Sequence, residues 1–193
     1  MTQPDDNLMA YLAARRSIPA VKLAEPAPSG DDLDRILTVA ARVPDHGKLA
    51  PWRFIVIAGD DRTAFVDRVM AIWRKNNPDA SAEDERVERG KREAGPLLVV
   101  IVSRTVDHPK IPAWEQELSA GAVCMNFVHA CNASGYVAQW LTAWLAFDTD
   151  VADLLGLEEG DRIAGFMHVG TPTEAPVERD RPDLSAIVSR WQA

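Results

Sequence analysis

The chain has 193 residues, of which 47% are hydrophobic and 26% are charged, and its formal net charge is −8. Length and composition predict a soluble globular protein with one domain over residues 1–193. The negative charge argues against nucleic acid or an anionic membrane as a partner. The low-charge stretch Leu118–Ala133 is shorter than the ~20 residues of a membrane span. Because no secretory signal pattern follows the acidic start, we expect a cytoplasmic protein.

The two cysteines, Cys124 and Cys131, fall within one predicted helix. At a rise of ~1.5 Å per residue, their Cα atoms are too far apart for a disulfide. We therefore expect reduced cysteines that pack in the core, as in a reducing compartment.

In the first half of the chain, helical patterns of apolar residues surround one strand-like run. Helices are predicted over Asn7–Arg16, from Leu33 to Ala41, around Phe65–Trp73 and over Ala82–Ala94, and a strand is predicted over Phe54–Ile57. Ser29 and Asp32 are expected to cap the second helix, and Pro44 is expected to end it. The fourth helix is acidic early and basic late, which predicts a solvated, charged face.

The second half contains the most apolar segments. Leu97–Val102 is a continuous apolar run, typical of a strand buried on both faces. The segment from about Trp114 to Ser134 predicts a long helix, apolar on nearly every side, which must be buried in a core or against a second subunit. Two more strands are predicted over Val137–Leu141 and Ile163–Val169, with a short helix between them. Together these elements predict an α+β fold.

The common enzyme signatures are absent from the sequence. No two glycines are separated by a single residue, so there is no GxGxxG dinucleotide fingerprint. There is also no Walker-type phosphate loop, HExxH, CxxC or GxSxG segment. The four histidines are scattered without metal-ligand spacing, so we expect no metal. These exclusions leave a cofactor that is bound without a glycine-rich loop.

Arg15, Arg16 and Ser17 stand together at the end of the first predicted helix. Two guanidinium groups and a hydroxyl suit a phosphate, because arginine donates forked, charge-assisted hydrogen bonds. The same residues also fit an ordinary helix C-terminus, where cations interact favourably with the helix dipole. Spacing alone leaves both interpretations open.

Two further segments are candidates for binding. Arg42 to His46 form a polar loop between a helix and a strand, a common place for binding residues, although a lone histidine is more often an ordinary loop residue. Ser119-Ala120-Gly121 permits close approach of a backbone or a planar ring, or simply tight helix packing. Glu115 and Glu117 are not expected to form an acid/base pair, because residues two apart on a helix point in different directions.

Six segments, in register over nearly the whole chain, resemble the nitroreductase family. They read RRS (15–17), LAEPAP (23–28), VPDH (43–46), PWRF (51–54), WEQELSAG (114–121) and GTP (170–172). Many family members carry Gln before the Pro-Trp pair, where this chain has Ala50.

This resemblance implies a homodimer with a mixed, mostly antiparallel sheet flanked by helices, and with the long helix buried at the dimer interface. It also implies FMN bound across that interface. One subunit would hold the phosphate and ribityl side with Arg15, Arg16 and Ser17, and the other would reach the same flavin with Arg42 and His46. Further flavin contacts are implied at Trp140, Leu141, Thr142 and Arg181.

The resemblance also implies the reaction. Hydride would pass from NADH or NADPH to flavin N5 and then to a nitroaromatic, a quinone or a related small-molecule electron acceptor. The chemistry belongs to FMN, so no catalytic side chain is expected. The segment matched to the nicotinamide nucleotide comprises Ala130, Cys131, Asn132, Ala133, Ser134 and Gly135. Three alternatives remain: an FMN-binding or storage module without turnover, an interaction dimer that has lost the site, and a relative that fragments flavin or removes halogen.

Overall fold

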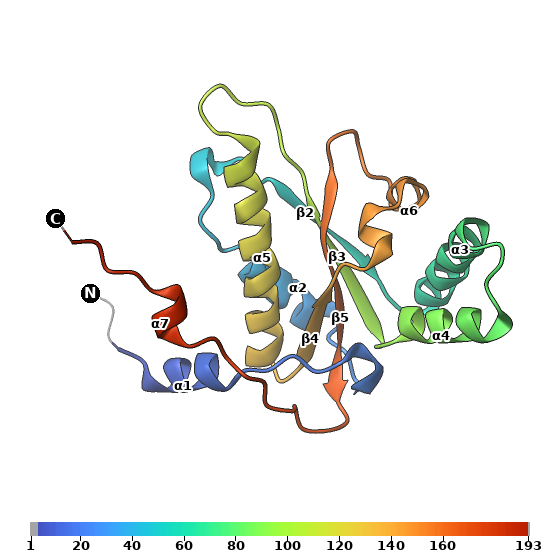
Figure 1. The fold of residues 1–193 in the computed structure, drawn as a ribbon, viewed down its shortest axis with the longest axis horizontal. Helices are drawn as coiled ribbons and strands as arrows, with labels where there is room; N and C mark the ends of the chain where they lie inside the picture. Colours follow the sequence, from blue (N-terminus) through green and yellow to red (C-terminus); the bar gives the residue numbers. More distant parts are fainter. Residues whose placement is uncertain (1–3, 193) are drawn as a thin grey trace.

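A five-stranded sheet forms the centre of the computed structural model, which describes residues 4–192 (Figure 1). Four strands follow the order β1 (Leu23–Ala24), β5 (Arg162–Pro172), β3 (Leu97–Ser103) and β2 (Trp52–Ile57), and β4 (Val137–Leu141) also pairs with β5. Every pairing within residues 4–192 is antiparallel. The expected α+β fold with a mostly antiparallel sheet is therefore confirmed.

Strand β3 separates two hydrophobic cores. All seven of its residues are buried, as its continuous apolar run predicted. Successive side chains of a strand point to opposite faces, so Leu97 and alternate residues enter one core, while Leu98 and alternate residues enter the other. Helices α2 (Gly30–Ala40) and α5 (Ala113–Ala133) cover the first core.

Helix α5 packs on the sheet with only one side. Val123, Phe127 and Cys131 on that side are completely buried. The opposite side carries Leu118, which is 54% exposed, and the partly exposed Gly121 and Ala122. A single chain therefore leaves an apolar helix face without a cover. No helix within residues 4–192 combines the length and apolar character that crossing a membrane requires.

The second core lies beneath α3 (Asp60–Asn76), α6 (Thr149–Leu154) and the 3₁₀ helix η3 (Trp144–Phe147). Beside α3 lies α4 (Ala82–Glu93), the charged helix whose whole polar face was expected to be solvated. That expectation is wrong for Glu88, which is only 7% exposed. Glu88 accepts a hydrogen bond from the Trp144 indole at 2.7 Å and pairs with Arg92 at 3.1 Å. Part of the charge run therefore connects α4 to η3.

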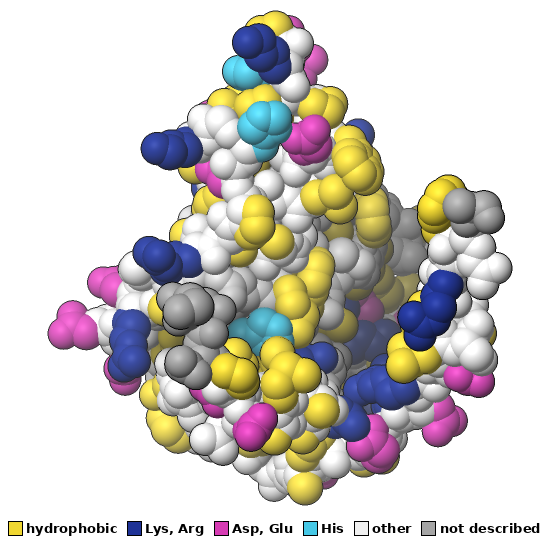
Figure 2. Space-filling view, turned by 90° about the vertical axis from the view of Figure 1, so that its left-hand side faces the viewer, with side chains coloured by type: hydrophobic (Ala, Val, Ile, Leu, Met, Phe, Trp, Pro, Cys, Tyr) yellow, Lys and Arg dark blue, Asp and Glu magenta, His cyan; other side chains and the backbone are white. Residues whose placement is uncertain are grey.

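Both chain ends project from the same side of the molecule (Figure 1). Helix α1 (Asp6–Ala14) buries none of its residues, and α7 (Leu184–Ile187) lies in an exposed tail. Figure 2 faces this side and shows a hollow between the body and the C-terminal arm, with basic side chains at its foot. The arm itself exposes Ile187 and Trp191, at 63% and 87%. Apolar surface of this kind is usually an interaction site.

Two local expectations are corrected. Helix α1 ends at Ala14, before Arg15 and Arg16, whereas the apolar pattern extended it to Arg16. Ser29 occupies the position before α2, but its side chain forms no capping hydrogen bond. Gly30 follows with a positive φ of 51°, so the backbone turns between the Ser29 side chain and the first helical turn.

Candidate functional site

The Arg15–Ser17 segment runs between α1 and the 3₁₀ helix η1 (Ala20–Lys22). Arg15 leaves the helical conformation, with φ −58° and ψ 132°, while its N–H still bonds to the Tyr11 carbonyl. Ile18 follows with 3% exposure and anchors the segment in the core. The two arginine side chains are therefore held half-buried beside a fixed backbone.

Arg16 forms a forked ion pair with both carboxylate oxygens of Glu178 in the C-terminal tail. Its remaining Nη1 donates to the carbonyl of Ala13 at 2.8 Å. The Arg16 hydrogen bond, with a smaller contribution from the charge of Arg181, lowers the pKa of Glu178 to about 2. One of the predicted flavin ligands therefore binds this carboxylate directly, and the charge of a second, Arg181, acts on it from a longer distance. This is the same forked geometry that arginine uses to bind a phosphate.

Arg15 forms no ion pair with any residue between positions 4 and 192. Its charge acts on Tyr11 and His129, whose hydroxyl oxygen and Nδ1 lie 2.9 Å apart. Burial and the positive charge of Arg15 together lower the pKa of His129. The Arg15 guanidinium is thus a cation that no carboxylate of this region neutralises.

Arg42 and His46 lie in the loop between α2 and β2, which several contacts hold in place. Asn126 of α5 donates from Nδ2 to the Val39 carbonyl at 2.6 Å. The Asp45 carboxylate accepts from the backbone N–H groups of Leu49 and Ala50 at 3.1 and 2.9 Å. The loop is therefore constrained at both ends.

Gly47 permits a close approach inside this loop. It has a φ of 73°, and a Cβ added to it would lie 2.5 Å from Cδ1 of Ile111. Only glycine accommodates both the positive φ and this contact. The tight packing fixes the path of the chain directly after His46.

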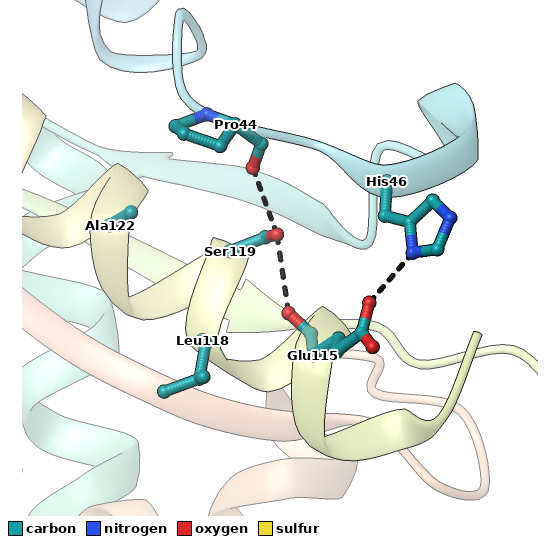
Figure 3. A pocket seen from close by; sticks show the side chains of 6 residues that line it. All are labelled: Pro44, His46, Glu115, Leu118, Ser119 and Ala122. Atoms are coloured by element: carbon teal, nitrogen blue, oxygen red, sulfur yellow. Dashed lines mark hydrogen bonds and ion pairs between the residues drawn. The ribbon is translucent and has the colours of Figure 1, made fainter. Parts of the chain in front are cut away.

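His46 faces the start of α5, with its Nδ1 2.7 Å from Oε2 of Glu115 (Figure 3). Beside this pair, the Ser119 hydroxyl donates to the Pro44 carbonyl at 3.0 Å. A cavity of about 350 Å³ opens here, lined by Pro44, His46, Glu115, Leu118, Ser119 and Ala122. Sequence reasoning did not assign Glu115 a role, because its partner lies 69 positions away. Glu117 instead pairs with Arg162 at 3.7 Å.

Trp140, Leu141 and Thr142 lie at the end of β4, where Trp140 pairs with Met167 of β5. The Trp140 indole donates to the Ala164 carbonyl at 2.9 Å and covers Gly165. Trp140 remains 39% exposed, so its ring is available at the surface of the sheet edge.

The segment predicted to bind the nicotinamide nucleotide ends α5 and borders a second cavity of about 630 Å³. This cavity is lined by Asp5, Leu8, Tyr11, Leu12, Val39, Asn126, His129, Ala130, Asn132 and Ala133. Cys131 instead points into the core, and burial raises the pKa of its thiol to about 12. Ser134 and Gly135 are exposed in the turn that follows.

Besides the β4 edge and the end of α5, the predicted phosphate and loop residues occupy two separate places. An arginine half-site contains Arg15, Arg16, Ser17 and Arg181, and a histidine half-site contains Arg42, His46, Glu115 and Ser119. Helix α5 contacts Tyr11 through His129 near one end and His46 through Glu115 near the other, ~21 Å apart at 1.5 Å per residue. Within residues 4–192, no hydrogen bond or ion pair joins Arg15–Ser17 to Arg42 or His46. The same residues contain no cluster of metal ligands.

Comparison with known proteins defines the family. The Nitroreductase family profile matches residues 12–171. A protein of Escherichia coli K12, named "Putative NAD(P)H nitroreductase YdjA", is 34% identical over 184 residues, covering 94% of this chain and 97% of that protein. The chain therefore belongs to the nitroreductase family, which confirms the resemblance seen in its six segments.

Solved structures confirm the fold. A nitroreductase-like family protein from Bacillus cereus superimposes with a TM-score of 0.80 at 23% identity, with all of both chains covered. A nitroreductase with bound FMN from Bacteroides fragilis gives a TM-score of 0.67 at 19% identity, covering 96% of this chain and 98% of the other. The nitroreductase-like arrangement thus extends over almost the entire chain.

Proposed function

We propose that this protein is an FMN-dependent oxidoreductase that uses NADH or NADPH to reduce nitroaromatics, quinones or related small organic acceptors. Its principal support is the arginine half-site, where Arg16 forms a forked pair with a carboxylate that also feels the charge of Arg181, and where Arg15 pairs with no carboxylate within residues 4–192. Such a concentration of cations in a chain of net charge −8 marks a place for an anion. The name of the Escherichia coli relative and the FMN in the Bacteroides fragilis structure identify a suitable cofactor.

The residues present fit FMN. The Glu178 carboxylate occupies a fork of Arg16 that would equally receive phosphate oxygens, and Ser17 adds an exposed hydroxyl beside it. Trp140 to Thr142 would provide the further flavin contacts at the β4 edge. When bound, FMN supplies the hydride-accepting and hydride-donating chemistry, and the protein orients its partners and adjusts the charge around it.

We propose that the functional unit is a homodimer joined through α5. Its uncovered face carries Leu118, Gly121 and Ala122, at spacings of three and four residues from Leu118. If two copies of α5 cross antiparallel about a two-fold axis, the start of one lies beside the end of the other. The histidine half-site of one subunit would then meet the arginine half-site of its partner. A flavin between them would contact both chains.

The nicotinamide nucleotide is proposed to bind at Ala130–Gly135. The adjacent cavity of about 630 Å³ supports this assignment, since Ala130, Asn132 and Ala133 line it. We also propose the cytoplasm as the location of the protein. Cys124 and Cys131 support this location, because both are buried free thiols, as is usual in a reducing compartment.

The visible spectrum of the purified protein tests the activity directly. We expect a flavin spectrum that is bleached under anaerobic conditions by NADPH or by NADH, and that recovers on addition of a quinone. A flavin spectrum that neither nucleotide bleaches would favour an FMN storage module. A colourless protein that FMN cannot reconstitute would contradict the proposed cofactor.

The variant Arg15→Ala tests the arginine half-site. We expect weaker FMN binding with an unchanged fold, because Arg15 contributes to the half-site and little to the core. The matched control is Arg35→Ala, which removes an exposed arginine from α2. Equal flavin affinities of wild type and Arg15→Ala in a titration would contradict the assignment.

A further inference from the structure

We propose that His46 donates a proton to the organic acceptor and that Glu115 positions the His46 ring for this transfer. The inference rests on the proposed function, which supplies the acceptor. It adds a catalytic side chain where the family resemblance led us to expect that the flavin alone carries the chemistry.

The contact with Glu115 distinguishes the two ring nitrogens of His46. Nδ1 lies 2.7 Å from the Glu115 carboxylate, which accepts hydrogen bonds but donates none when ionised. Nδ1 therefore keeps its hydrogen, and Nε2 becomes the nitrogen that gains and loses a proton. Figure 3 shows the second ring nitrogen on the side away from Glu115.

The pair of His46 and Glu115, here called the dyad, has the rigidity that a positioning role requires. Gly47 packs closely on Ile111 directly after His46, and the Asp45 carboxylate closes the loop by accepting two backbone N–H groups. Glu115 lies in the first turn of a 21-residue helix, and its backbone N–H donates to the Pro112 carbonyl at 3.1 Å. The ring is thus held between two ordered segments that are far apart in sequence.

The dyad borders open space rather than the core. The side chains of His46 and Glu115 are 60% and 39% exposed, and both line the cavity of about 350 Å³ with the apolar Leu118. Within residues 4–192, the only salt bridge of His46 is the one to Glu115. In the proposed dimer this end of α5 faces the flavin held by the partner. An acceptor over that flavin would have an apolar wall and one proton donor on this side.

The reduction of a quinone consumes a proton, which such a donor would supply. Reduction of a quinone to a hydroquinone takes two electrons and two hydrogens. A hydride from the reduced flavin brings both electrons and one hydrogen to one quinone oxygen, which leaves negative charge on the other oxygen. That oxygen takes the proton from Nε2 of His46, and water then reprotonates the ring. Bound FMN would supply these electrons, and NADH or NADPH would replace them.

Two acceptors separate proton donation from electron transfer. The FMN-loaded dimer is reduced with dithionite, and its reoxidation by menadione is compared with reoxidation by ferricyanide, which takes up electrons without protons. We expect the ratio of the two rates to fall by about 100-fold in His46→Gln, a typical loss for a general acid. In Glu115→Ala a smaller fall, of about tenfold, is expected because the ring remains but is no longer oriented. The matched control Glu117→Ala should keep the wild-type ratio.

The position of the ring proton provides a second readout that involves no turnover. In protein with ¹⁵N-labelled histidine, we expect the His46 resonances of the wild type and of Glu117→Ala to show Nδ1 protonated. In Glu115→Ala this preference should be lost. Because the side chains are exposed, all of these variants are expected to fold, which circular dichroism checks.

The outcomes are distinguishable. An unchanged rate ratio in His46→Gln would overturn the proton-donor role, and an unchanged tautomer in Glu115→Ala would overturn the positioning role. If NADH and NADPH fail to reduce the flavin, only the proposed nucleotide-dependent activity fails. The dithionite experiment still decides the role of His46 in that case.

Discussion

Arg16 and Glu178 are 162 positions apart in the sequence and meet in a forked ion pair. The pair fastens the C-terminal tail to the segment that follows α1. It also occupies the guanidinium that we propose as a phosphate ligand. The tail carboxylate and the FMN phosphate should therefore compete for Arg16.

The first prediction follows from this competition. Glu178→Gln should tighten FMN binding by about twofold to fivefold, a modest effect because exposed ion pairs are weak. Titration of flavin-free protein with FMN, followed by fluorescence, measures the change. The control Glu174→Gln disrupts the neighbouring pair with Lys22 and should leave flavin affinity unchanged. Weaker binding by Glu178→Gln would mean that Glu178 orders the half-site instead of competing for it.

The second prediction concerns acid stability. Burial lowers the pKa of His168 to about 4, with help from the charges of Arg62 and Arg92 and against its hydrogen bond to the Ala94 carbonyl. The unfolded chain, with an ordinary pKa of ~6.5, then binds the proton first as pH falls. Stability present above pH ~6.5 should decrease down to about pH 4, by ~3 kcal/mol as an upper estimate.

Urea unfolding between pH 7.5 and 4.5 measures this decrease. His168→Gln keeps a donor for the Ala94 carbonyl but cannot be protonated, so its stability should depend less on pH in this window. An equally steep dependence in the variant would show that other groups cause the loss.

The third prediction uses two glycines to test the dimer interface. A Cβ on Gly90 of α4 or on Gly121 of α5 meets no atom within 4 Å in the single chain. Gly90→Ala should raise stability by ~0.5–1 kcal/mol, because alanine is the better helix former. Gly121→Ala should instead weaken the dimer, because its methyl group would enter the face that we propose to pack against the partner. Sedimentation equilibrium and thermal unfolding measure both effects, and equal stabilisation by the two variants would contradict the proposed interface.

The fourth prediction addresses the β4 edge. Gly165→Ala places a methyl group against the Trp140 indole, 2.5 Å from its Cδ1, so the ring must move. We expect a changed tryptophan emission spectrum and FMN binding weakened by about tenfold, within the ~1–3 kcal/mol that overpacking costs. In a Trp140→Leu background the same change should have little further effect. Additive losses would mean that Gly165 does not act through Trp140.

Local patterns predicted the larger elements well. The apolar run at β3 and the nearly all-apolar helix α5 are recognised from a few consecutive residues, because burial on both sides requires apolar side chains throughout. Strand β1 was not predicted, because its two residues are too few to show a period. The end of α1 was placed too late, because Ile18 draws the chain into the core, a tertiary effect that the pattern of α1 does not contain.

The chemistry of single side chains suggested candidate site residues, but their pairing was not predictable. The side chains of Arg15, Arg16 and Ser17 suited a phosphate and also an ordinary helix C-terminus, and only the family resemblance assigned them to FMN. The contacts of Arg16 with Glu178, of His46 with Glu115 and of Trp144 with Glu88 join residues 162, 69 and 56 positions apart. The periodic pattern of apolar residues within one element gives no information about contacts between positions so far apart in the sequence. For the same reason Glu88 was mistaken for part of a solvated face.

Strand β5 pairs with β1, β3 and β4, so three of the four other strands depend on one segment near the C-terminus. During synthesis on the ribosome, β3 emerges more than fifty residues before β5. Until then one edge of this strand, which is apolar from Leu97 to Val102, has no partner, a state that favours aggregation. Truncated mRNAs that end before the codon for Arg162 should therefore yield polypeptides that cells degrade by proteolysis or deposit in inclusion bodies. Heterologous expression of shortened forms should fail for the same reason.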